Sequence, residues 1–203
     1  MEAVAAKPVA KKQKSREIPE ALVYEIVDGK PVYYKGYRDV LSGKTNLESA
    51  MSESSLQAWL KARLSFLLYS ALEEHGYDIL TGELGLLLGE GTQRGADVSV
   101  YKSADLVLSA HYATLPPELI IEIDVQADME DHSEMDYILR KIDDYLRFGV
   151  KKVVWVFTSN RKIMIAAPGQ PWLTVDWSAE VDLLGGVSIC LENVLAGKTV
   201  SLK

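Results

Sequence analysis

Apolar and polar residues alternate in several short stretches of the chain, and this two-residue period predicts β-strands. The first two strands, at 22–27 and 31–34, flank the turn pair Asp28-Gly29 and are predicted to form an N-terminal hairpin. The stretch 118–124 is almost continuously apolar, which is typical of a strand buried on both faces. The remaining strands are predicted at 77–81, 84–88, 96–101, 152–157 and 162–166.

Two segments instead show the three-and-four spacing of apolar residues that predicts an amphipathic helix. The first begins after a capping residue, Ser52 or Ser54, and stops at Gly76. The second spans roughly 133–148 and stops at Gly149. Each helix has one apolar face, so each is expected to pack on a sheet.

Two further segments complete the predicted order of elements. Residues 35–51 are polar and irregular, and the chain ends in a predicted strand at 187–191 and a short helix at 192–196. Helices placed among strands in this order predict an α/β fold, with a central mixed β-sheet flanked by helices.

Composition is that of a globular protein. The chain has 203 residues, of which 48% are hydrophobic and 25% are charged, so we expect one domain over residues 18–203. Residues 1–17 lack apolar periodicity and are predicted to be a disordered basic tail. We expect no membrane association and a cytoplasmic protein, because no apolar run approaches about 20 residues and the N-terminus lacks a signal-peptide core.

The charge distribution argues against simple binding of a polyanion. The tail carries five cations and two acids, a balance of +3, so the total of −7 leaves about −10 on residues 18–203. An acidic body repels nucleic acid at long range, and phosphate contacts normally dominate nucleic-acid affinity. A nucleic-acid partner therefore requires a local basic groove, bound metal ions or a substrate other than a duplex.

Three acids stand out by their position in predicted strands. Asp97 begins one strand, and Glu122 lies in the apolar middle of another, two residues before Asp124. A buried carboxylate is costly unless it is paired or bound to a metal. If these acids converge from neighbouring strands, their oxygens suit Mg²⁺.

One lysine is placed to join these acids. Lys141 borders the apolar arc of the second predicted helix beside Tyr145, where its ammonium could reach a site at the seam between helix and sheet. An edge lysine more often extends along the apolar surface into water. Glu25 and Glu53 are interpreted as exposed carboxylates, and the three histidines lack metal-ligand spacing.

The chain contains four sequence blocks in a fixed order: RGADVSV at 94–100, PPELIIEI at 116–123, KIDDYLRFGV at 141–150 and VVWV at 153–156. In this order they resemble a bacterial family of predicted restriction endonucleases in the PD-(D/E)XK nuclease superfamily. The segments YEIVDG at 24–29 and LGGVS at 184–188 are similar to the ends of that family. The resemblance covers roughly residues 20–197.

The resemblance implies a restriction-endonuclease-like fold, divalent-metal binding and phosphodiester hydrolysis. Asp97 matches the first acid and Glu122 the second, while Lys141 matches a lysine that has moved from the strand to the following helix. Asp124 occupies the place where that lysine usually stands, and Ala96 replaces the proline that usually precedes the first acid. The acidic loop at 124–134 departs from the shorter segment expected of the family.

The sequence therefore predicts a nuclease with Asp97, Glu122 and Lys141 as catalytic residues and Asp97, Glu122 and Asp124 as ligands of Mg²⁺ or Mn²⁺. The expected partner is nucleic acid, DNA in the first place, and the expected assembly is a homodimer. The alternative is a nuclease fold with little or no catalysis that serves as a binding or assembly module. An unrelated α/β hydrolase is disfavoured because the chain has no GxSxG-like elbow.

Overall fold

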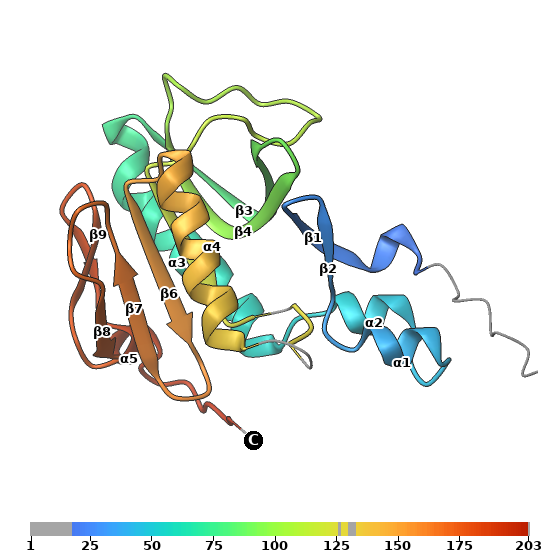
Figure 1. Ribbon diagram of the computed structural model, residues 1–203. Helices are drawn as coiled ribbons and strands as arrows, with labels where there is room; N and C mark the ends of the chain where they lie inside the picture. Colours follow the sequence, from blue (N-terminus) through green and yellow to red (C-terminus); the bar gives the residue numbers. More distant parts are fainter. Residues whose placement is uncertain (1–17, 126, 130–132, 203) are drawn as a thin grey trace, which may run out of the picture.

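The structure of the chain is a computed structural model that describes residues 18–125, 127–129 and 133–202 (Figure 1). The predicted tail at 1–17 lies outside these residues, as does part of the acidic loop. The described chain forms a central sheet with helices on both faces. The predicted α/β class is thereby confirmed.

The central sheet has eight strands among the described residues, in the order β2-β1-β4-β5-β6-β7-β8, with β3 paired to β4. Neighbouring strands run antiparallel except for the parallel pair β5 and β6. A separate hairpin is formed by β9 and β10. The strands are β1 (Val23–Val27), β2 (Lys30–Tyr33), β3 (Tyr77–Gly89), β4 (Thr92–Lys102), β5 (Leu119–Ile123), β6 (Lys152–Phe157), β7 (Lys162–Ala166), β8 (Leu173–Asp176), β9 (Val181–Leu184) and β10 (Val187–Ile189).

The two predicted helices cover opposite faces of this sheet, one in front of it and one behind it (Figure 1). Helix α3 (Ser55–Leu72) begins at a capping box between Ser54 and Gln57, and its buried leucines pack on Ile121 and Ile123 of β5. Helix α4 (Glu134–Phe148) ends at Gly149 and packs on Ile120 and on β6. Alternate residues of β5 thus enter two separate cores, as the period of a strand requires.

Several segments differ from the sequence prediction. Residues 35–51, predicted to be irregular, contain the short helices α1 (Tyr37–Leu41) and α2 (Leu47–Met51). The two strands predicted at 77–81 and 84–88 are one strand, β3, interrupted by an irregularity between Thr81 and Leu84. Strands β8 and β9 were not predicted, and the terminal helix α5 (Leu191–Val194) begins one residue earlier than expected.

Among the residues that the structure describes, none of the helices combines the length and apolar character needed to cross a bilayer.

Candidate active site

The candidate site lies where two strands follow one another along the same edge of β4. Strand β3 pairs along one edge of β4 from end to end, so β5 and β1 must share the other edge. Strand β5 pairs with Val98 to Val100, whereas β1 meets β4 only at Gln93. Between β5 and β1, two carboxylates accept hydrogen bonds from backbone amides. Asp97 accepts from the Ile123 amide at 2.8 Å, and Glu25 accepts from the Gly95 amide at 3.1 Å.

Lys141 reaches this point from helix α4 and is only 1% exposed. Its Nζ lies 2.9 Å from Glu25 Oε1 and 3.2 Å from Glu122 Oε1. Burial alone would lower the pKa of Lys141, but the charges of Glu122 and Glu25 raise it well above its usual value. The lysine predicted at the edge of the helix is therefore a buried cation that bridges two carboxylates.

Glu122 is the carboxylate whose ionisation costs most in this site. Burial raises its pKa to about 8, and repulsion from Asp97 adds to the effect while Lys141 opposes it. The Tyr145 hydroxyl lies 2.5 Å from Glu122 Oε1 and also within hydrogen-bonding distance of the Gly95 carbonyl, and it donates its single proton to one acceptor at a time. All hydrogen bonds and ion pairs of Glu122 among the described residues thus involve the single oxygen Oε1.

Glu25, interpreted from the sequence as an exposed carboxylate, is 3% exposed, so that interpretation was wrong. It accepts from Arg94 at 2.6 Å and from the Tyr137 hydroxyl at 2.6 Å, besides its ion pair with Lys141. Burial would raise the pKa of Glu25, but Lys141 and Arg94 together lower it. The available signal was strand alternation, which places Glu25 on the same face of β1 as the buried Val27.

Arg94, the first residue of the block RGADVSV, holds Glu25 in place. Its guanidinium is buried between Glu25 and Asp144 of α4, with Nη2 2.6 Å from Asp144 Oδ2. The two ion pairs connect the N-terminal hairpin, strand β4 and helix α4. The guanidinium offsets part of the cost of desolvating the two carboxylates, and its removal would leave buried charge without a partner.

Asp97 faces a different lysine. Its Oδ1 lies 3.3 Å from Nζ of Lys61 on α3, and Lys61 also pairs with Glu53. No direct contact joins Asp97 to Lys141 among the described residues, but its charge acts on Glu122. Lys61 was not predicted as a site residue, although its burial follows from its place next to Leu60 and Leu64 on the inner side of α3.

Asp124 forms its hydrogen bonds with Thr158. Strand β5 ends at Ile123, and Asp124 adopts a left-handed backbone with φ of 58°. Its carboxylate accepts from the Thr158 amide at 2.7 Å and from the Thr158 hydroxyl at 2.6 Å. The strand alternation that would place Asp124 beside Glu122 therefore does not extend to it.

The raised pKa of Glu122 predicts that stability falls with rising pH. Between its ordinary value of 4.5 and the folded value of about 8, the folded protein retains a proton that the unfolded chain has released. This contribution is fully present below 4.5 and is lost as the pH rises through about 8, with a slope of at most about 1.4 kcal/mol per pH unit. Glu122→Gln should remove this slope in urea denaturation curves recorded from pH 5 to 8. The exposed Glu90→Gln should keep it, and equal slopes in all three proteins would contradict the assignment.

Comparison with known proteins identifies the family and the fold. The sequence model of the family Uma2, described as "Putative restriction endonuclease", matches residues 44–200. The chain belongs to the Uma2 family. The family predicted from the four sequence blocks is thereby confirmed, although the hairpin that supplies Glu25 precedes the matched region.

A solved structure shares the fold of this Uma2 protein. It is "a putative nuclease belonging to DUF820 from Anabaena variabilis ATCC 29413", with a TM-score of 0.58 and 14% sequence identity. The match covers 71% of this chain and 82% of the other. Among curated proteins, no sequence matches the chain. The family and the fold together support a nuclease.

Proposed function

We propose that this Uma2 protein is a metal-dependent nuclease that hydrolyses phosphodiester bonds of nucleic acid, with DNA as the substrate. Asp97, Glu122 and Lys141 are its proposed catalytic residues. The observation that carries the proposal is the direct contact of Lys141 with Glu122, at 3.2 Å, on a carboxylate that also experiences the charge of Asp97. A cation beside two repelling acids, in a family of restriction endonucleases, is the expected composition of such a site.

The donor set fits a hard divalent cation such as Mg²⁺ or Mn²⁺. Both proposed ligands are carboxylates, and a bound dication would offset the burial and the Asp97 repulsion that raise the pKa of Glu122. Among the described residues, no group of three or more acids, histidines or cysteines is arranged to hold an ion. Mg²⁺ commonly uses one or two carboxylates and completes its shell with water and substrate phosphate, so two ligands are compatible with it.

The residues divide the chemistry between them. A bound divalent ion would polarise the phosphate and make an attacking water more acidic. Lys141 would stabilise the negative charge that develops on the phosphoryl group, because its high pKa keeps it protonated. Glu25 would hold the Lys141 ammonium in position, and Tyr145 would orient Glu122 through its hydroxyl.

Asp97→Asn tests this assignment. The amide oxygen can still accept from the Ile123 backbone, so the fold should persist while a charged ligand is lost. We expect Mn²⁺ affinity, measured by calorimetry, to fall at least about tenfold, together with cleavage of mixed single- and double-stranded DNA and RNA. The exposed Asp143→Asn on α4 is the matched control and should change neither quantity. Unchanged Mn²⁺ affinity in Asp97→Asn would remove Asp97 from the site.

The burial of the site favours one alternative, a nuclease fold that binds or assembles without catalysis. Glu122 and Lys141 are 2% and 1% exposed, and the Asp97 carboxylate already forms an ion pair with Lys61. Purified protein that shows no Mg²⁺- or Mn²⁺-dependent cleavage of DNA or RNA would support this alternative. Equal behaviour of the wild type and Lys141→Met in binding assays would then exclude the nuclease function.

A further inference from the structure

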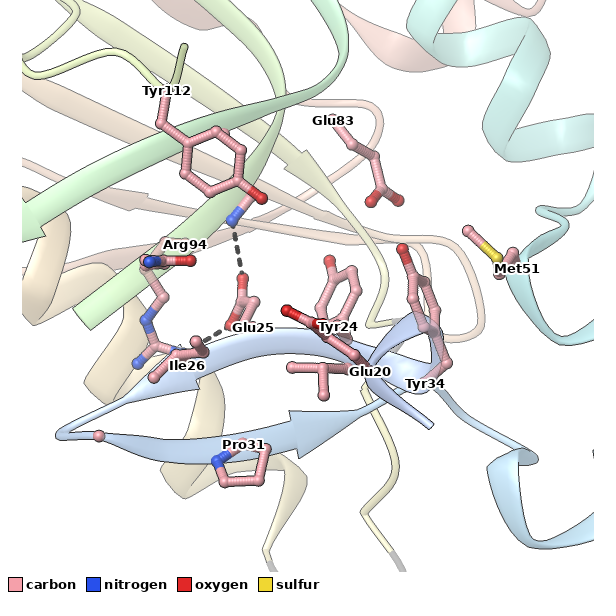
Figure 2. A pocket seen from close by; sticks show the side chains of 15 residues that line it. Glu20, Tyr24, Glu25, Ile26, Pro31, Tyr34, Met51, Glu83, Arg94 and Tyr112 are labelled. Carbon is pink, nitrogen blue, oxygen red and sulfur yellow. Dashed lines mark hydrogen bonds and ion pairs between the residues drawn. The ribbon is translucent and has the colours of Figure 1, made fainter. Parts of the chain in front are cut away.

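A cavity of about 530 Å³ lies beside the candidate active site, between the N-terminal hairpin and strands β3 and β4 (Figure 2). Glu25 and Arg94 form one side of it, and the backbone of Gly95, two residues before Asp97, also lines it. A segment of substrate held at Asp97 and Glu122 would therefore have this cavity within reach. The other residues that line the cavity have no role in the proposed catalytic mechanism.

Four polar groups converge on the cavity: the hydroxyls of Tyr24, Tyr34 and Tyr112 and the carboxylate of Glu83. Figure 2 shows the hydroxyl ends of Tyr24 and Tyr34 directed towards Glu83 and Tyr112 across the open space. Among the described residues, none of these three hydroxyls and neither Glu83 oxygen forms a hydrogen bond or ion pair. These residues are half-buried or exposed, so their oxygens face the open cavity, where a ligand that supplies hydrogen-bond donors and acceptors could replace water.

The backbone directs Glu83 into this space. Glu83 lies in the irregular part of β3, between Thr81 and Leu84, and has a left-handed φ of 59°. A bulge of this kind re-aims a side chain, and a left-handed conformation at a residue other than glycine is a strain that is commonly found at functional sites. The half-buried Glu83 carboxylate is thereby held opposite the tyrosines rather than in the regular alternation of the strand.

Tyr112 offers an aromatic surface. A Cβ atom on Gly85 would lie 2.6 Å from Cδ1 of Tyr112, so the ring packs directly on the β3 backbone and needs glycine there. Tyr112 is nevertheless 56% exposed, which leaves ring surface available to a ligand. Aromatic rings placed in this way stack on nucleobases with little regard to sequence.

The charges of the lining exclude a phosphate as the occupant. Arg94 is the single cation among the described lining residues, and its guanidinium is engaged by Glu25 and Asp144. Glu20 and Glu83 add negative charge. The uncharged part of a nucleotide, its base, therefore fits this cavity better than its phosphate.

We propose that the cavity binds one unpaired nucleobase that carries an exocyclic amino group, as in cytosine, adenine or guanine. The amino group would donate to Glu83, the ring would stack on Tyr112, and the tyrosine hydroxyls would contact the remaining polar edge. This inference rests on the proposed action on nucleic acid and adds to it a preference for single-stranded or locally opened substrate. An uncharged base as the recognised group also accords with the net charge of −7.

The test is nucleoside binding in the absence of metal, followed by two-dimensional NMR of the ¹⁵N-labelled full chain. Cytidine, adenosine and guanosine should shift resonances of residues around the cavity, and uridine should bind several-fold more weakly. Tyr112→Ala should weaken all four nucleosides by about tenfold. Glu83→Gln should remove the difference between cytidine and uridine. The exposed variants Tyr69→Ala and Glu90→Gln should behave as wild type.

Each remaining outcome distinguishes this inference from the proposed nuclease. Cleavage of nucleic acid without nucleoside binding would overturn the base cavity and leave the nuclease intact. Base-selective binding without any metal-dependent cleavage would support the cavity and overturn the nuclease. Equal binding of uridine and cytidine, or tighter binding of choline than of any nucleoside, would overturn the inference in favour of an unselective or a cation-binding cavity.

Discussion

Replacing Lys141 with methionine is expected to lower the rate of phosphodiester hydrolysis by at least about 10²–10³. The ammonium would act when negative charge builds on the phosphate, so its loss would affect the transition state more than the bound substrate. Divalent-metal affinity should not decrease, because a cation beside the ion repels it. Asp97→Asn should differ by losing metal affinity and activity together.

Lys141→Met is also expected to destabilise the protein, because Lys141 is buried and does not lie at the exposed edge of the helix as the sequence predicted. Without the ammonium, Glu25 and Glu122 lose their shared partner, and breaking such a buried pair costs about 3–5 kcal/mol. Below pH 8 Glu122 can take up a proton, so the variant should be most stable at low pH. Its fold should therefore be verified at the pH of the cleavage assay, where Glu122 must be ionised to hold a metal ion.

The control for Lys141→Met is Arg140→Met. Arg140 precedes Lys141 on the same helix, but its side chain is 50% exposed and pairs with the exposed Asp28. This control should retain both stability and activity. Circular dichroism would verify that Lys141→Met is folded. If the folded variant cleaves at the wild-type rate, Lys141 is a structural cation.

Trp155→Ala is expected to destabilise the protein by about 3–5 kcal/mol in denaturant unfolding. Trp155 is 1% exposed on the central strand β6 and packs in the same core as Ile138 and Ile142 of α4. Its ring also stacks on Phe157, with centroids 6.4 Å apart. Removal of this ring would leave a cavity that the surrounding rigid strands cannot close.

Trp155→Phe separates packing from polarity in this prediction. The indole Nε1 is buried without a hydrogen-bond partner among the described residues, so its removal costs no hydrogen bond. Phenylalanine keeps most of the apolar surface and should cost less than alanine. A loss below about 1 kcal/mol for Trp155→Ala would mean that β6 tolerates a cavity at its centre.

Local patterns in the sequence determined the elements that carry the site. The apolar spacing and the stop glycine of α4 predict a helix that the structure places at Glu134 to Phe148, and the apolar run at 119–123 gives a strand buried on both faces. These features depend on neighbouring residues and on side-chain periodicity, so they can be read without knowledge of the fold. The order of the four blocks identified the family and drew attention to Asp97, Glu122 and Lys141.

Tertiary structure alone decided which charges meet. Glu25 reaches Lys141 because β1 follows β5 along the same edge of β4, a pairing that no local pattern encodes. Lys61 forms an ion pair with Asp97 because α3 covers the face opposite α4. The Asp124 carboxylate accepts a hydrogen bond from the Thr158 amide because its backbone leaves the strand. Long-range pairing and strand register bring together residues that are distant in the chain, and the burial that follows sets the pKa of each group.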